Sequence, residues 1–124
     1  MALASATACN QALNGLDASG TPTNVMSHVS LHSASPSTTG ANAYANSGSY
    51  ARQACSWNAA SSSSKANSSS LTFTTGGSVA CTHFGTWSSG TYAGGTYGIG
   101  GALSSSVTAV TITVAAGALT LSAS

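Results

Sequence analysis

The side chains that could hold a metal ion are three histidines and three cysteines. His28 and His32 lie four residues apart in one alternating segment, and His83 belongs to another. Four residues of a strand span roughly 13 Å, so two such histidines cannot share one ion without a bulge. The cysteines are widely spaced and match no C-x-x-C site. We therefore expect no metal or other cofactor, and histidines that are hydrogen-bonded to neighbouring strands.

The cysteines could instead serve the fold. They are Cys9, Cys55 and Cys81, an odd number that fits no disulfide framework. Cys55 and Cys81 both stand in strand-like alternation, which predicts buried thiols. A bridge between these two residues, or between subunits, is the alternative.

Acid–base and nucleophilic catalysis lack their usual groups. The chain has no glutamate and a single aspartate, Asp17, at the end of a predicted helix. It can therefore form neither a carboxylate pair nor a Ser-His-Asp set with an evident orienting group. The glycines of residues 94–101 match no phosphate-binding spacing. We expect the protein not to be an enzyme.

Charge is nearly absent from the chain. Asp17, Arg52 and Lys65 are its only charged residues, 2% of the chain against roughly 25% in ordinary soluble domains. Two basic residues cannot form a nucleic-acid footprint, and no apolar run is long enough to span a membrane. A formal net charge of +1 gives little repulsion between copies, which favours an assembled state. A secreted domain rich in small polar residues is the alternative.

The only arginine lies in the segment 48–60, between Tyr50 and Trp57. Alternation there predicts a strand over residues 50–58, with Gln53, Cys55 and Trp57 on one face. A lone cation between large aromatic residues suggests that the fold itself positions Arg52.

Aromatic residues are the candidate contact residues of the chain. Together with the arginine, the candidates are Tyr50, Arg52, Trp57, Trp87, Tyr92 and Tyr97. Aromatic rings among Asn and Ser side chains could bind a host cell-surface glycan, which requires exposed and roughly coplanar rings. Packing within the fold or between subunits is the alternative, and it predicts that the same rings are buried.

One domain with two parts is expected to carry these residues: an N-terminal helix and cap (1–20) and a β-sandwich (21–124). A helix over residues 2–16 is predicted by residues that recur at spacings of three and four, namely Leu3, Ala6, Cys9 or Asn10, Leu13 and Leu16. A short uncharged helix is barely stable alone, so it must pack on something.

The rest of the chain reads as short strands separated by turn signals and one long loop, 33–49. The predicted strands are 24–32, 50–58, 70–75, 78–87, 99–103, 106–114 and 118–121, with a Ser/Asn linker over 59–69. Leu71 and Phe73 should point inward, and Val110, Ile112 and Val114 should share a face. About seven short strands with one N-terminal helix predict a mainly β fold, either a single β-sandwich or a small Greek-key barrel.

Five ordered blocks resemble a family of small structural proteins of tailed phages. The blocks are residues 29–42, 49–60, 82–87, 97–104 and 114–121. The family is common in phages of actinobacteria and is usually described as tail fibre, minor tail or virion structural protein. The resemblance covers nearly the whole chain and brings no catalytic residues.

The resemblance implies a multi-copy virion protein whose partners are other copies of itself and other virion proteins. The N-terminus lacks the pattern of a signal peptide, so we expect synthesis and assembly in the host cytoplasm. A capsid decoration protein that stabilises the head is the first alternative. A host-glycan-binding module is the second.

Overall fold

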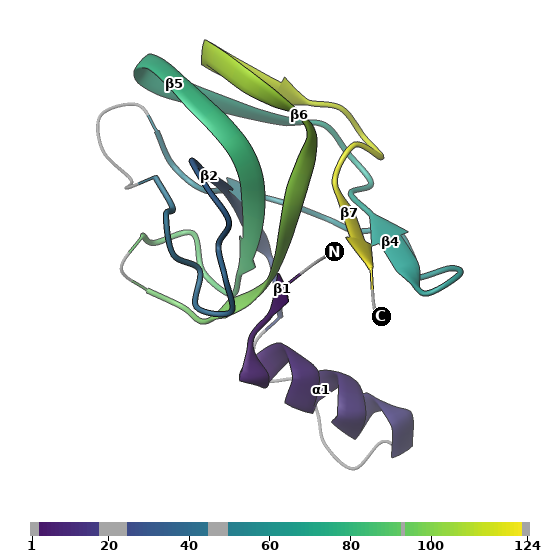
Figure 1. Cartoon of the computed structure of the whole chain (residues 1–124). Helices are drawn as coiled ribbons and strands as arrows, with labels where there is room; N and C mark the ends of the chain where they lie inside the picture. The colour runs from purple at the N-terminus through teal and green to yellow at the C-terminus, as the bar shows by residue number, and fades with distance from the viewer. Residues whose placement is uncertain (1–2, 18–24, 45–49, 93, 123–124) are drawn as a thin grey trace.

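A computed structural model describes residues 3–17, 25–44, 50–92 and 94–122 (Figure 1). The described elements, in order, are β1 (Leu3–Ala4), α1 (Ala6–Asp17), β2 (His28–His32), β3 (Gln53–Ala54), β4 (Ser64–Ala66), β5 (Leu71–Trp87), β6 (Tyr97–Val114) and β7 (Thr120–Ser122). Five strands form one antiparallel sheet in the order β1-β6-β5-β2-β3, and β4 pairs with β7. The fold is thus mainly β with one helix, consistent with the predicted small sandwich or barrel.

Several predicted segments extend beyond the described residues. These are residue 2 of the predicted helix, residues 18–20 of its cap, residue 24 of the first predicted strand and residues 45–49 of the long loop.

Two long strands replace four predicted short ones. β5 has 17 residues and β6 has 18, and Figure 1 shows both strands bending along their length. The prediction that Gly76-Gly77 ends a strand is wrong, because β5 continues through this pair. Thr74 pairs with Thr111 and Val79 pairs with Ala109, so five residues of β5 advance against two of β6. The surplus on β5 forms a bulge, which bends the hairpin.

The bulge also corrects one predicted face. Ile112 and Val114 are buried, but Val110 is 50% exposed. Val110 lies opposite the bulge, where the alternation of side chains is interrupted. Leu71 and Phe73 are buried, as predicted.

Strand β2 is buried on both faces, whereas the alternation of the sequence suggested one polar face. Val29 and Leu31 are fully buried, and so are Ser30 and His32. The loop after β2 covers the polar side, since the Ala41 carbonyl oxygen lies 2.7 Å from His32 Nδ1.

The N-terminus forms a strand before it forms a helix. Leu3 and Ala4 pair with Gly100 and Ile99 of β6, so the predicted helix over residues 2–16 begins too early. The Ser5 hydroxyl accepts a hydrogen bond from the backbone N–H of Ala8 at 3.2 Å. Ser5 therefore caps the helix and fixes its start at Ala6.

The predicted strand 50–58 is reduced to Gln53–Ala54, and a strand appears where a linker was predicted. β4 (Ser64–Ala66) pairs with β7, and Trp57 forms an isolated bridge with Asn67. A run of serines carries no apolar period, so the sequence gives no sign of this strand.

Asn67 joins the end of β4 to the turn that precedes β7. Its side chain is fully buried. Nδ2 donates to the carbonyl oxygens of Ser69 at 2.8 Å and Ala115 at 3.0 Å, and Oδ1 accepts from Leu119 N–H at 2.9 Å. One amide thus satisfies three backbone groups in the segments that flank the β4–β7 pair.

Replacing Asn67 by alanine is expected to lower the free energy of unfolding by about 2–3 kcal/mol, because buried backbone groups lose their partners. Urea denaturation measures this change. Asn58→Ala removes an exposed amide and should cost less than about 0.5 kcal/mol. Equal effects of the two substitutions would contradict the role given to Asn67.

The turn before β4 carries backbone strain. Ser62 and Ser63 have φ of 50° and 60°, and the backbone of Ser61 and Ser64 is joined by two reciprocal hydrogen bonds. Positive φ at both central residues is the geometry of a type I′ turn, which favours Asn-Gly.

The double substitution Ser62→Asn and Ser63→Gly is therefore expected to stabilise the fold by about 1 kcal/mol. Thermal unfolding of the variant is the measurement. Ser61→Gly is the matched control, because Ser61 lacks a positive φ, and it should give no gain. A melting temperature of the double variant at or below that of the native chain would refute the assignment.

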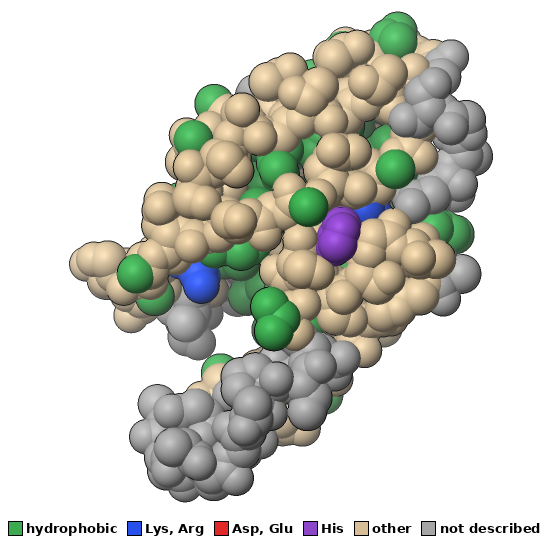
Figure 2. Space-filling model, turned by 180° about the vertical axis from the view of Figure 1, so that it is seen from behind, with side chains coloured by type: hydrophobic (Ala, Val, Ile, Leu, Met, Phe, Trp, Pro, Cys, Tyr) green, Lys and Arg blue, Asp and Glu red, His purple; other side chains and the backbone are tan. Residues whose placement is uncertain are grey.

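The described surface is almost uncharged. Figure 2 shows one face of the molecule with two small blue areas and no red among the described residues. Cys55 and Cys81 are free and buried, which confirms the prediction of buried thiols, and Cys9 is free and exposed. Burial raises the pKa of the Cys55 and Cys81 thiols. No helix in the described residues is both long and apolar enough to cross a membrane.

Candidate functional site: the Arg52 cluster

Four of the six predicted contact residues, Arg52 and three aromatic residues, lie close together in the fold. The Arg52 guanidinium carbon lies 3.7 Å from the centroid of the Trp87 ring and 5.9 Å from that of Tyr92. The Trp87 and Tyr97 rings make an edge contact with centroids 5.4 Å apart. We call Arg52, Trp87, Tyr92 and Tyr97 the Arg52 cluster. The fold does position the lone arginine, but the rings that face its guanidinium are those of Trp87 and Tyr92, which lie far from it in the sequence.

The other two predicted residues lie elsewhere. Tyr50 is in the core, where its ring stacks on Phe73 with centroids 6.1 Å apart and its hydroxyl accepts from Leu31 N–H at 2.9 Å. Burial raises the pKa of Tyr50 to about 12. Trp57 lies at its bridge with Asn67. The six residues therefore do not form one surface.

Arg52 binds the loop between β5 and β6 by its backbone. Nη1 lies 3.0 Å from the carbonyl oxygens of Ser89 and Thr91 and 3.2 Å from that of Gly94, and Nη2 lies 2.8 Å from that of Tyr92. The side chain is only 5% exposed. A planar guanidinium with five N–H donors can serve several acceptors at once, which an ammonium group cannot do with the same geometry. Arg52 therefore fixes the path of this loop.

A chain of buried hydrogen bonds continues from the cluster to β2. Trp87 Nε1 donates to Ser30 Oγ at 2.7 Å, and Ser30 Oγ lies 2.7 Å from His32 Nε2. His32 Nδ1 lies 2.7 Å from the Ala41 carbonyl oxygen, which can only accept, so Nδ1 carries the proton. Nε2 must then accept from the Ser30 hydroxyl. Every group in this chain has its partner when His32 is neutral.

The surroundings of His32 favour this neutral form. Burial lowers the pKa of His32 to about 4, against the raising effect of the Ala41 hydrogen bond. His83 and Arg52 lower the pKa further by charge repulsion. His32 is therefore uncharged at neutral pH.

Two glycines make room for the side chains of His32 and Trp87. A Cβ atom at Gly85 would lie 2.6 Å from His32 Nε2, and one at Gly40 would lie 2.6 Å from the Trp87 ring. Gly40 also has a φ of 79°, which other residues rarely adopt. Side chains at these two positions would displace the imidazole or the indole.

The Ser30–His32 pair stabilises the fold. The distance between Ser30 Oγ and His32 Nε2 would suit a nucleophile and its base, but both side chains are fully buried and the hydroxyl is hydrogen-bonded to His32 and Trp87. A substrate has no access to Ser30 Oγ. Among the residues that the structure describes, no group of three or more His, Cys, Asp or Glu side chains could hold a metal ion.

The exposed part of the cluster is small. Tyr92 is 44% exposed, whereas Tyr97 is 4% exposed. The planes of Trp87 and Tyr97 are inclined by 65°, so they form no flat platform. The surface that the cluster presents is thus mainly Tyr92, on a loop whose backbone is fixed, with a smaller part of the half-buried Trp87.

Sequence reasoning missed the polar side chains that hold this arrangement. Ser30 and His32 share the polar face of the predicted strand 24–32, and Asn67 stands in the predicted linker 59–69. The sequence around His32 offered one signal, a strand in which Ser30 and His32 alternate with apolar residues. Whether these polar side chains are buried depends on the loop that covers them. No local signal identified Asn67.

Comparison with known proteins identifies a family. The model of the family described as "Podophage GP4 fiber I protein gp80" matches residues 3–122 of the chain. This range includes the helix and all strands that the structure describes. No curated protein matches the chain.

Proposed function

The chain belongs to the family of the podophage GP4 fiber I protein gp80, and on this premise we propose that it is a multi-copy subunit of a phage tail fibre or of an adjoining minor tail structure. The family describes a phage fibre-type structural protein and hence a component of the virion. The observation that carries the proposal is the extent of the match, which runs from β1 to β7.

The composition of the surface supports the multi-copy part of the proposal. The chain has three charged residues, and Arg52, one of them, is buried. Contacts between copies therefore desolvate few ions, which removes a large cost of close packing. The proposed partners are other copies of the chain and other virion proteins, joined in the host cytoplasm. The resemblance to proteins of actinobacterial phages supports an actinobacterium as the proposed host.

The proposal assigns the chain no catalytic step. The guanidinium of Arg52 binds carbonyl oxygens of the loop between β5 and β6 and stacks on the Trp87 ring at the end of β5. It thereby holds this loop and the segment before β3 against the sheet. A rigid loop backbone suits a subunit that must present one surface to its neighbours, because little entropy is then lost on assembly.

A contact with host-surface glycan is the second candidate function. Tyr92 favours it, because this exposed ring stands on a loop whose carbonyl groups are fixed by Arg52. Tyrosine rings in a Ser- and Gly-rich loop supply adaptable contact at low entropic cost. A capsid decoration role, which we also predicted, has less support, because the matching family is a fibre protein.

Deleting the gene from a phage that carries the chain tests the proposal. We expect particles with intact heads that lack a fibre, and complementation with the native chain should restore it. Protein composition of purified particles and negative-stain electron microscopy are the measurements. Particles that retain all their fibres but have unstable heads would instead support the decoration role. Absence of the chain from native particles would refute both.

A further inference from the structure

Helix α1 has little support from its own chain. None of its described side chains is buried, and Leu13 is 63% exposed. The helix has 12 residues, with no acidic residue in its first turn and no basic residue in its last. An isolated helix of this length is marginal in water, and helices in proteins depend on packing of one face. The Leu13 side chain thus lacks a covering surface among the described residues.

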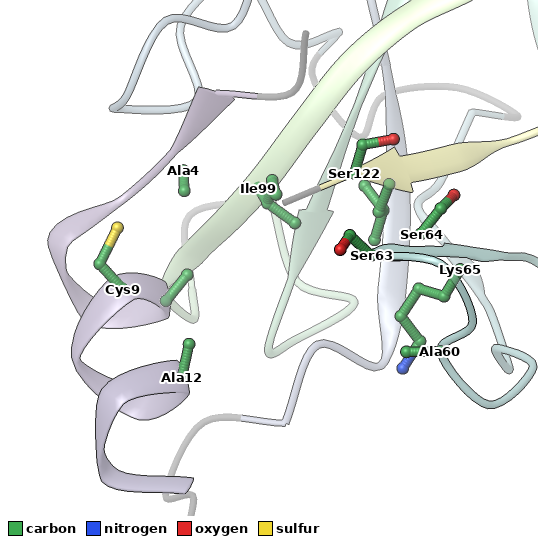
Figure 3. A pocket seen from close by; sticks show the side chains of 11 residues that line it. Ala4, Cys9, Ala12, Ala60, Ser63, Ser64, Lys65, Ile99 and Ser122 are labelled. Atoms are coloured by element: carbon green, nitrogen blue, oxygen red, sulfur yellow. The ribbon is translucent and has the colours of Figure 1, made fainter. Parts of the chain in front are cut away.

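A groove lies beside this helix. It has a volume of about 450 Å³ and separates α1 from the β4–β7 pair. Figure 3 shows Ala12 on the helix side, Ile99 between the walls, and Ser64 and Lys65 on the far side. The lining is mostly small and apolar, so the groove can accept side chains from the face of a helix.

The charges of the chain indicate what fills the groove. Lys65 is the one charged residue that lines it. The only acidic residue of the whole chain is Asp17, the last residue of α1. In a second copy, α1 carries the exposed Leu13 and ends at this acidic residue, so it is complementary to the groove in apolar character and in charge. Charge complementarity of this kind selects the partner and its orientation.

We infer that helix α1 of a second copy docks in the groove between α1 and the β4–β7 pair. Leu13 of the second copy fills the apolar part, and Asp17 of that copy lies near Lys65. This inference rests on the proposed multi-copy function and specifies the surface through which copies meet. The contact is reciprocal if two copies exchange helices, because each copy then supplies one helix and one groove.

An arginine scan of α1 tests the groove in the full-length chain. Ala12→Arg places a charge inside the groove, and it should weaken self-association by about 100-fold or more, as expected for an unpaired buried charge. Asn10→Arg is the matched control, because Asn10 is exposed on the same helix and does not line the groove. It should change the dissociation constant by less than about threefold. Sedimentation equilibrium measures both variants.

A charge exchange tests the orientation. Asp17→Lys and Lys65→Asp should each weaken association by about tenfold, and the double variant should restore it. Lysine at the end of a helix favours the helix itself, so lost association could not be attributed to a lost helix. Amide hydrogen exchange gives a second readout, since protection of α1 should rise with protein concentration.

Two outcomes would overturn the inference: a monomer at every concentration, or an oligomer that Ala12→Arg does not affect. Location of the chain in the particle is measured separately. If the chain is found in a fibre while Ala12→Arg has no effect, the docking of α1 is wrong and the proposed function stands. Rescue in the double charge variant, with concentration-dependent protection of α1, supports the inference.

Discussion

Replacing Arg52 by methionine is expected to lower the free energy of unfolding by about 3–5 kcal/mol, because several backbone carbonyl oxygens lose one buried charged donor. Methionine retains much of the side-chain volume, so the loss reflects hydrogen bonds and ring contact more than a cavity. The carbonyl oxygens of Ser89, Thr91, Tyr92 and Gly94 would all lose a charged donor. Hydrogen bonds to charged groups contribute about 1.5–3 kcal/mol each, and part of this returns when water enters the loop.

Two substitutions serve as controls for Arg52→Met, all measured by urea denaturation at low protein concentration. Arg52→Lys keeps the charge but not the planar fork, so it should recover less than half of the loss. Lys65→Met removes the other basic residue from a half-buried position on β4 and should cost under about 1 kcal/mol. A loss below 1 kcal/mol for Arg52→Met would show that the arginine does not hold the loop.

Acidification from pH 7 to pH 4 is expected to remove about 3 kcal/mol of stability through His32. The pKa of this imidazole is about 4 in the folded protein, against 6.5 for a histidine exposed to water. The unfolded chain therefore binds more protons between these two values, and stability falls as the pH decreases through this window. The stabilisation is fully present above about pH 6.5, and each pKa unit corresponds to 1.36 kcal/mol.

The structural reason is the proton on His32. A second proton on Nε2 would face the Ser30 hydroxyl, which already receives Trp87 Nε1–H, in a site with no exposed surface. His83 and Arg52 also disfavour a cation there. His32→Gln should flatten the dependence of stability on pH between 6.5 and 4, even if the variant is less stable at pH 7. His83→Gln keeps His32 and should keep most of the slope, because burial lowers the pKa of His32 more than His83 does. An unchanged slope in His32→Gln would contradict this account.

Local patterns predicted the core well where it depends on alternation alone. Leu71 and Phe73 point inward and Cys55 and Cys81 are buried, because each stands in a segment with a clear period of two. The sequence also indicated that the fold positions Arg52, but the rings that face it, Trp87 and Tyr92, come from a distant segment and were not predictable.

Features that depend on distant segments were not predictable. Gly76-Gly77 is a turn signal by itself, yet pairing with β6 holds it inside a long bulged strand. The polar face of β2 is buried because the loop through Ala41 folds over it. Asn67 matters because the turn before β7 brings Ala115 and Leu119 to its amide. Each of these outcomes is decided by a partner that lies at least nine residues away in the chain.

A cryo-electron microscopy map of the intact particle tests most directly whether the chain is a subunit of a tail fibre. We expect density in a fibre of the tail that fits the β5–β6 hairpin and the β4–β7 pair, repeated in several copies. Density for this fold on the capsid lattice, with none in the fibre, would contradict it.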